Sequence, residues 1–132
     1  MDDKHLQLKV YSPTRIFYEG EAEFVEFVTT EGELGVYPNH IPLTAVVAPG
    51  VLRITVDGKV REATLLDGFA TILPKEIVIL SEACEWPEEI DIHRAEEARI
   101  RAERKLAMEQ TVRDELALRR AIVRMQLANK YR

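Results

Sequence analysis

The last third of the chain contains no glycine and no proline. All six Gly and all six Pro lie before residue 88, the last being Pro87. From Glu88 to Arg132 the chain is rich in Ala, Arg, Glu and Leu, which have the highest helix propensities. The residues that most restrict or break a helix are therefore confined to the first part of the chain. The sequence predicts a helical segment over 88–132, attached to a different kind of structure over 1–87.

The first part consists of short β-prone runs separated by turn residues. Runs 51–56 and 60–66 flank Asp57-Gly58, a pair typical of a tight β-hairpin turn. Runs 69–73 and 77–80 are separated by only three residues. Roughly seven or more strands at this spacing predict a sandwich or flattened barrel, and about 80 residues suffice to close one modest core.

One stretch of the first part, residues 31–43, breaks this regularity. Its sequence, EGELGVYPNHIPL, holds two Gly and two Pro, so we expect neither a regular strand nor a regular helix there. His40 and Ile41 lie in its NHIP segment and are expected on a projecting loop. An ordered loop with exposed apolar residues is typical of a contact surface for a partner. A corner that closes the end of the sandwich is the alternative.

After Pro87 the spacing of apolar residues changes from two to about 3.6. Asp91 is a good N-cap for a helix that runs to about Met108, and a second helix is expected over about 112–129. Residues 109–111 between them carry the reversal. Alanines recur on one stripe of each predicted helix: Ala95, Ala98 and Ala102, then Ala117, Ala121 and Ala128. Because Ala buries little area, this antiparallel pair should be held by roughly a few kcal/mol, so the hairpin can open.

The two parts also differ in charge. Residues 1–87 hold 14 acidic and 7 basic side chains, a net of −7, whereas residues 88–132 hold 9 acidic and 11 basic, a net of +2. The acidic first part argues against general nucleic-acid binding, which needs clustered positive charge. The arginine-rich second part suits an acidic partner or a phosphate ligand.

Several functional classes lack a signal in this sequence. It contains no GxxxxGK[ST], GxGxxG or HExxH motif, and its three His lie in three different segments. No metal site is expected, and enzymatic activity is poorly supported. Cys84 is the only cysteine, which excludes an internal disulfide, and we expect it to be a small buried hydrophobe. With no run of about 18 apolar residues, the chain is expected to be soluble and cytoplasmic.

A set of arginines is the strongest candidate for a binding site. Arg94 and Arg101 recur at helical spacing on the first helix, and Arg120 and Arg124 share a face of the second. If the helices fold back, these guanidiniums converge on one anion. Guanidinium matches phosphate oxygens bidentately, which favours a phosphate-bearing ligand.

Two acids and one small residue complete this candidate site. Glu85 and Asp91 are placed to accept hydrogen bonds from an adenine amino group or ribose hydroxyls, and Ala95 leaves room for a flat base. The plainer interpretation is that Asp91 only caps the helix and the arginines only pair with neighbouring glutamates.

Four segments resemble the epsilon subunit of bacterial F-type ATP synthases, and the resemblance covers the whole chain. GELGVYPNHIPL is similar to the family's GELGILPGHxPL segment, and LLDGFATILPKEIVIL to its strand pair with a central G-G-F or D-G-F. IDIHRA is similar to the I/LDxxRA motif associated with ATP binding, and ELALRRAIVR to the second-helix pattern that carries RxxxR. The resemblance implies an α+β fold in two parts: an antiparallel β-sandwich of about ten strands (1–87) and an antiparallel two-helix hairpin (88–132).

The resemblance also implies which residues bind ATP. The family's ATP-binding positions fall on Glu85, Ile90, Asp91, Arg94, Ala95, Arg101, Arg120 and Arg124. Two departures from the family pattern bear on this prediction. The segment between the helices is shorter than in some relatives, and Asn39 stands where Gly is common in the loop.

By resemblance, the chain is a non-catalytic regulatory subunit of the rotor stalk, peripheral on the cytoplasmic face of the cell membrane. Its sandwich is expected to dock on the gamma subunit and the c-ring, with His40 and Ile41 in that contact. ATP, with or without Mg²⁺, is the expected regulatory ligand and favours the compact hairpin. In the extended state the second helix is expected to meet the beta subunit through Arg119, Arg120, Arg124 and Lys130. The alternative is a free-standing adaptor whose hairpin binds a partner helix or peptide.

Overall fold

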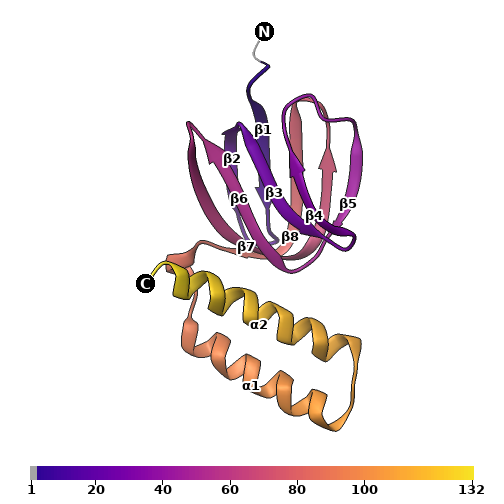
Figure 1. Ribbon diagram of the computed structural model, residues 1–132, viewed down its shortest axis with the longest axis vertical. Coiled ribbons are helices and arrows are strands. Elements are labelled where there is room, and N and C mark those ends of the chain that lie inside the picture. The colour runs from indigo at the N-terminus through magenta and orange to yellow at the C-terminus, as the bar shows by residue number, and fades with distance from the viewer. Residues whose placement is uncertain (1–2) are drawn as a thin grey trace.

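In the computed structural model, which describes residues 3–132, the chain forms a β-sandwich and a helical hairpin stacked end to end (Figure 1). The described part of the sandwich contains eight strands: β1 (Leu6–Tyr11), β2 (Ile16–Ala22), β3 (Phe24–Thr29), β4 (Gly32–Val36), β5 (Leu43–Val47), β6 (Gly50–Val56), β7 (Lys59–Ile72) and β8 (Glu76–Glu85). A short 3₁₀ turn, η1 (Pro87–Glu89), leads into α1 (Ile92–Met108) and α2 (Val112–Lys130). The predicted α+β fold is confirmed, with eight strands rather than about ten.

The strands belong to one sheet that curls back on itself. Neighbouring strands follow the order β2-β1-β8-β7-β5-β3-β4, and β6 closes the sandwich by pairing with both β3 and β7. Among the described strands, every pair is antiparallel except β1 and β8, which run parallel. β8 therefore ends at the same end of the sandwich as β1, and this is the end from which the helices continue (Figure 1).

β7 is long because two predicted strands are continuous. The runs 60–66 and 69–73 join across Asp67 and Gly68, which have positive φ angles of 68° and 139°. A Cβ atom at Gly68 would lie 1.9 Å from the carbonyl oxygen of Leu80, so the bend requires glycine. This Asp-Gly pair bends the strand without ending it, which accounts for part of the lower strand count.

Part of the stretch 31–43 is a regular strand, contrary to the prediction. β4 pairs with β3 over its whole length and lies at the end of the strand order. Both glycines of β4 occupy positions where a side chain would be strained. Gly32 has a φ of 118°, and a Cβ atom on Gly35 would lie 2.8 Å from the ring of Phe24. The irregular segment is shorter than expected. It comprises residues 37–42, at the end of the sandwich away from the helices (Figure 1).

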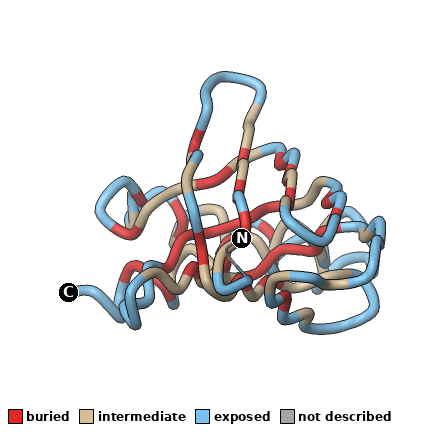
Figure 2. Tube along the Cα trace, turned by 90° about the horizontal axis from the view of Figure 1, so that it is seen from above, coloured by how far each residue is buried: buried red, intermediate tan, exposed pale blue. Residues whose placement is uncertain are grey.

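The core lies inside the curled sheet. Alternate residues of the strands point inward, as Leu6, Leu8 and Val10 of β1 do, each at 2% exposure or less. Figure 2 shows these buried positions along the strands, while the loops and hairpin tips are exposed. Cys84 is part of this core, as predicted, and burial raises the pKa of its thiol.

The helical hairpin forms as the periodicity predicts. The Asp91 carboxylate accepts a hydrogen bond from the Arg94 amide at 3.0 Å, and the Thr111 hydroxyl accepts one from the Asp114 amide at 3.1 Å, so each helix has its N-cap. The reversal lies at residues 109–111, as expected. Neither helix of the described chain is long and apolar enough to cross a membrane. The fully buried alanines of the hairpin are Ala95, Ala102, Ala121 and Ala128.

The linker between the two parts is held on the sandwich. The Trp86 ring stacks on the Phe17 ring with a centroid separation of 4.4 Å. The guanidinium carbon of Arg61 lies 4.0 Å from the centroid of the Trp86 ring. Three residues later, the Glu89 carboxylate accepts two hydrogen bonds from Arg15, at 2.7 and 2.8 Å. The hairpin therefore starts from a base that belongs structurally to the sandwich.

Candidate functional site

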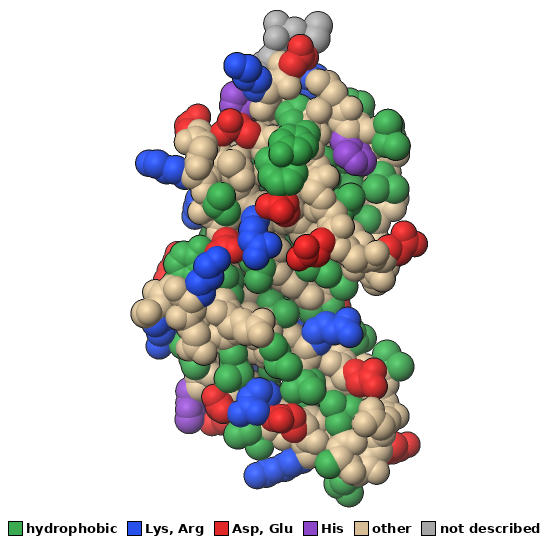
Figure 3. Space-filling model, in the orientation of Figure 1, with side chains coloured by type: hydrophobic (Ala, Val, Ile, Leu, Met, Phe, Trp, Pro, Cys, Tyr) green, Lys and Arg blue, Asp and Glu red, His purple; other side chains and the backbone are tan. Residues whose placement is uncertain are grey.

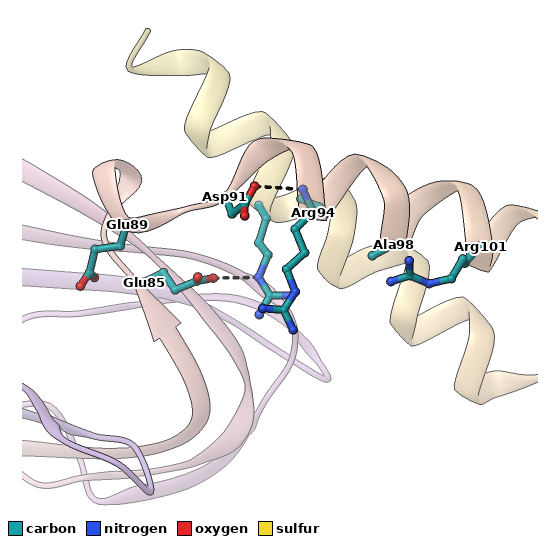
Figure 4. Close-up of a pocket in the computed structure, with 8 residues that line it drawn as sticks. Glu85, Glu89, Asp91, Arg94, Ala98 and Arg101 are labelled. Atoms are coloured by element: carbon teal, nitrogen blue, oxygen red, sulfur yellow. Dashed lines mark hydrogen bonds and ion pairs between the residues drawn. The ribbon is translucent and has the colours of Figure 1, made fainter.

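A pocket of about 440 Å³ lies where the end of β8, the linker and both helices meet. In Figure 4, Arg94 and Arg101 extend from α1 toward the same space, and Glu85 approaches it from the end of β8. The volume falls within the range of small-molecule sites. The residues that line it are Glu85, Glu89, Asp91, Arg94, Ala95, Ala98, Arg101 and Arg124.

Each carboxylate of this pocket already has a protein partner. Glu85 accepts a hydrogen bond from Nε of Arg124 at 2.7 Å, and Asp91 caps α1. Glu89 is held by Arg15, and this hydrogen bonding lowers the pKa of the Glu89 carboxyl. The negative charges of Glu85 and Glu89 are thus offset by arginine, so the pocket's acids oppose an incoming anion less than free carboxylates would.

Two guanidiniums of the pocket lack an acidic partner. Within residues 3–132, Arg94 and Arg101 take part in no ion pair and donate no side-chain hydrogen bond. Both have exposed side chains on the face of α1 that borders the pocket. A pocket with uncompensated guanidiniums and neutralised acids is suited to an anion, and guanidinium forks bind phosphate or carboxylate oxygens bidentately.

Six of the eight residues predicted to bind ATP line this pocket, and two lie outside it. Ile90 is only 3% exposed and packs with Leu127 and Ala128, so it anchors the start of the hairpin. Arg120 does not line the pocket and instead donates to Asp67 of β7. The six that come together are Glu85, Asp91, Arg94, Ala95, Arg101 and Arg124.

Glu89 is a pocket residue that the sequence prediction missed. Its Oε1 atom accepts a hydrogen bond from the Trp86 amide at 2.8 Å, three residues earlier. A Glu that reaches back to the amide three residues before it is half of a capping box. The sequence Trp-Pro-Glu-Glu at residues 86–89 therefore carried a local signal that Glu89 folds back onto the linker.

Basic side chains of α2 dock the hairpin on acids of the sandwich. Arg119 is exposed and has no acidic partner in the described chain, whereas the other three residues predicted to contact a beta subunit are each paired. In Figure 3 acidic and basic side chains gather along the boundary between sandwich and helices. The pairs are Arg120–Asp67, Arg124–Glu85 and Lys130–Glu62, at 2.6, 2.7 and 2.6 Å.

The loop over 37–42 presents apolar surface at the far end of the sandwich. Ile41 is 75% exposed, and Tyr37 of the same loop is 63% exposed. His40 holds the loop through Nδ1, which lies 2.7 Å from the Ile41 carbonyl oxygen. An isoleucine this exposed does not plug the end of the sandwich, and the contact surface expected here stays a prediction.

Comparison with known proteins identifies the family. The family described as "ATP synthase, Delta/Epsilon chain, beta-sandwich domain" matches residues 5–87. The ATP synthase epsilon chain of Caldanaerobacter subterraneus subsp. tengcongensis is 44% identical, over 98% of this chain and 97% of its own length. The chain belongs to the ATP synthase epsilon-chain family. A sodium-ion-specific ATP synthase epsilon chain from Acetobacterium woodii is 46% identical over 76% of each chain.

Solved structures share the epsilon-chain fold. A chain in the mitochondrial ATP synthase of Euglena gracilis, solved with OSCP, F1 and c-ring, has a TM-score of 0.82 at 22% identity and covers 96% of this chain and 82% of its own. A chain in the central stalk and c-ring structure of Tetrahymena thermophila mitochondrial ATP synthase has a TM-score of 0.64 at 14% identity, covering 99% and 98%. By its family, the chain is a non-catalytic subunit of ATP synthase.

Proposed function

We propose that the chain is a regulatory subunit of the rotor stalk, and that its hairpin responds to ATP. ATP binds the pocket and holds the hairpin on the sandwich. When ATP falls, the hairpin extends along the gamma subunit and blocks rotation in the hydrolysis direction. The observation that carries this proposal is a pocket built from three elements, with Glu85 on β8, Arg94 on α1 and Arg124 on α2. Such a pocket is complete only while the hairpin is docked.

The lining supports a nucleoside triphosphate as the ligand. Arg94 and Arg101 offer unpaired donors for phosphate oxygens. Glu85 and Asp91 each use one carboxylate oxygen for a protein donor and keep the other for a ribose hydroxyl or a base amino group. Ala95 adds a small apolar surface on which a flat base can lie. Mg²⁺, when present, binds through the phosphate oxygens.

Magnitudes support ATP as a switch. A ligand that binds only one state shifts the equilibrium by its affinity for that state. At a hundred times its Kd, ATP would stabilise the docked hairpin by about 2.7 kcal/mol. The alanine-lined helix contact is worth roughly a few kcal/mol, because each buried alanine removes little apolar area from water. The two quantities are of the same size, so a ligand held between α1 and α2 can decide whether the two helices stay paired.

The partners proposed for each surface follow from the family. We assign the loop with His40 and Ile41, and the sandwich that carries it, to contact with the gamma subunit and the c-ring. In the extended state, Arg120, Arg124 and Lys130 leave the sandwich acids and, together with the exposed Arg119, meet an acidic segment of the beta subunit. We propose a peripheral position on the cytoplasmic face of the membrane.

Thermal unfolding of the full chain tests the nucleotide. We expect ATP to raise Tm more than GTP or buffer does, with and without Mg²⁺, and Arg94→Ala to remove most of that rise. Arg104→Ala is the matched control, because Arg104 is an exposed arginine of the same helix that lies outside the pocket and, among the described residues, forms no ion pair. No ATP-specific shift, together with no effect of Arg94→Ala, would refute the nucleotide site.

Inhibition is tested separately in the assembled complex. ATP hydrolysis by the ATP synthase should rise when residues 90–132 are deleted, because the deletion removes the extending helices and leaves the linker base of Glu89 and Arg15. Unchanged hydrolysis would refute the inhibitory role even if the isolated chain binds ATP. A free-standing adaptor would show neither effect.

A further inference from the structure

The most deeply buried acid at the boundary between the two parts is used by neither the pocket nor the loop surface. Glu62 lies on β7 and is 4% exposed. Its Oε2 atom accepts a hydrogen bond from Nε of Arg53, its cross-strand neighbour on β6, at 2.9 Å. Its Oε1 atom accepts two more, from Nζ of Lys130 at 2.6 Å and from the Tyr131 hydroxyl at 2.7 Å.

Two of these three donors come from the far end of the helical hairpin. Lys130 is the last residue of α2 and Tyr131 is its C-cap. Figure 1 shows the C-terminus returning to the linker, beside the sandwich. The same end of α2 buries Leu127 and Ala128 against Ile90. Apolar packing and one buried carboxylate therefore hold the same turn of the helix.

The surroundings of Glu62 differ from those of the other ion pairs of α2. Arg124 with Glu85, and Arg120 with Asp67, have side-chain exposures of 27–36%, so water screens them. The Glu62 side chain is 4% exposed, although that of Lys130 is 60% exposed, and a carboxylate removed from water is stable only when donors satisfy it. Departure of α2 would leave Arg53 as its partner and open Glu62 to water. Docking of α2 in another register would leave Glu62 with Arg53 alone, because Lys130 and Tyr131 would no longer reach its Oε1 atom.

We propose that Glu62, Lys130 and Tyr131 form a clasp that holds the C-terminal end of α2 on the sandwich whether or not the pocket contains a ligand. The clasp selects one docked register of the hairpin, and the hairpin extends only after the clasp opens. Lys130 cannot meet a partner subunit while it is bound to Glu62. The proposal rests on the proposed function only in that both concern release of the docked hairpin.

Hydrogen exchange of the full-length chain without nucleotide tests the clasp. The amides of residues 122–130 should exchange roughly tenfold faster in Glu62→Gln, because the buried carboxylate that accepts hydrogen bonds from Lys130 and Tyr131 has lost its charge. Glu76→Gln is the matched control. It removes the carboxylate from a Lys–Glu pair of the sandwich, Lys9–Glu76 at 2.7 Å, that does not touch the helices. Exchange in Glu62→Gln at the rate of the Glu76→Gln control would overturn the clasp.

A second variant separates the clasp from damage to β7. Lys130→Met combined with Tyr131→Phe removes both helical donors, keeps the helix length and leaves Glu62 with Arg53. It should accelerate exchange of 122–130 as Glu62→Gln does, with the amides of the sandwich unchanged. Adding Glu62→Gln to it should have no further effect. Additive effects would show that Glu62 acts within the sandwich alone, which overturns the clasp.

ATP is added in a separate arm, so that the two proposals fail independently. Faster exchange in the clasp variants with no ATP protection of the unmodified chain would support the clasp and refute the nucleotide site. ATP protection together with unchanged exchange in both clasp variants would refute the clasp and support the nucleotide site.

Discussion

Arg120 and Asp67 form an ion pair across the boundary between α2 and the sandwich, with Nε and Nη2 of Arg120 at 2.7 and 2.6 Å from Oδ2 of Asp67. Asp67 occupies the bend of β7, where it has a φ of 68° and Gly68 follows it. A backbone feature of the sandwich thus supplies the acid that binds the helix. In this conformation Arg120 serves docking, while Arg94 remains unpaired in the pocket.

This difference between the two arginines predicts a difference in ATP binding. Arg94→Ala should weaken ATP binding roughly tenfold to a hundredfold, the value of one charge-assisted hydrogen bond. Arg120→Ala should mainly loosen α2, by about 1 kcal/mol or less, because its ion pair is partly exposed. Isothermal titration of both variants with ATP measures the difference. Equal losses of affinity would show that Arg120 leaves Asp67 to bind the nucleotide.

The bend of β7 predicts an intolerant glycine. Gly68→Ala should lower the free energy of unfolding by roughly 2–5 kcal/mol, because its Cβ atom would collide with the Leu80 carbonyl oxygen at 1.9 Å and its φ of 139° disfavours a side chain. Urea denaturation measures this loss. Gly58→Asn is the control, since Gly58 also has a positive φ but nothing lies within 4 Å of its Cβ position. A similar loss in both variants would contradict the steric argument.

Asp91 has a capping role that is separable from a role toward ligand. Asp91→Ala should destabilise the start of α1 by about 1 kcal/mol, whereas Asp91→Asn should keep the cap. If the second carboxylate oxygen binds ATP, as proposed, Asp91→Asn should still lose affinity, because an amide nitrogen cannot accept a hydrogen bond. Circular dichroism and ATP titration of the two variants give the two readings. Unchanged affinity in Asp91→Asn would limit Asp91 to capping.

Acid should loosen the C-terminal end of α2. Burial alone would raise the pKa of the Glu62 carboxyl, but hydrogen bonds from Lys130 and Tyr131, with the charges of Lys130 and Arg53, hold this pKa below the ordinary 4.5. The docked state therefore binds fewer protons than the released state. The contribution of Glu62 to the stability of the docked state is complete at pH values above the ordinary pKa of a glutamate. It is lost as the pH falls through the lowered pKa.

Protection factors for residues 122–130, measured by hydrogen exchange across the acid range, check this pH dependence. Glu62→Gln cannot titrate, so it should remove the part of the loss that belongs to Glu62. The lowered pKa of Glu89 adds its own acid dependence through Arg15, and this part should persist in the variant. An identical acid profile with and without Glu62→Gln would contradict the prediction.

Local signals were sufficient for the helices and insufficient for β7. Asp91 as N-cap, the end of α1 at Met108 and the reversal at 109–111 all follow from residues within one turn of the position concerned. Whether Asp67 and Gly68 end a strand or bend it depends on the neighbouring strand β8, whose Leu80 carbonyl oxygen lies against Gly68. No residue next to the bend carries that information.

The sequence by itself determined the division at Pro87, the two helices, the Asp91 cap of the first and a surplus of arginine on them, because helix breakers, caps and charges act locally. The tertiary structure decided which arginines meet in one pocket. Arg120 and Arg124 share a helix face, yet one turn, about 6 Å of rise, separates them. That distance puts Arg124 opposite Glu85 and Arg120 opposite Asp67. This pairing depends on how α2 lies on the sandwich, which is decided by contacts between residues that are distant in the chain.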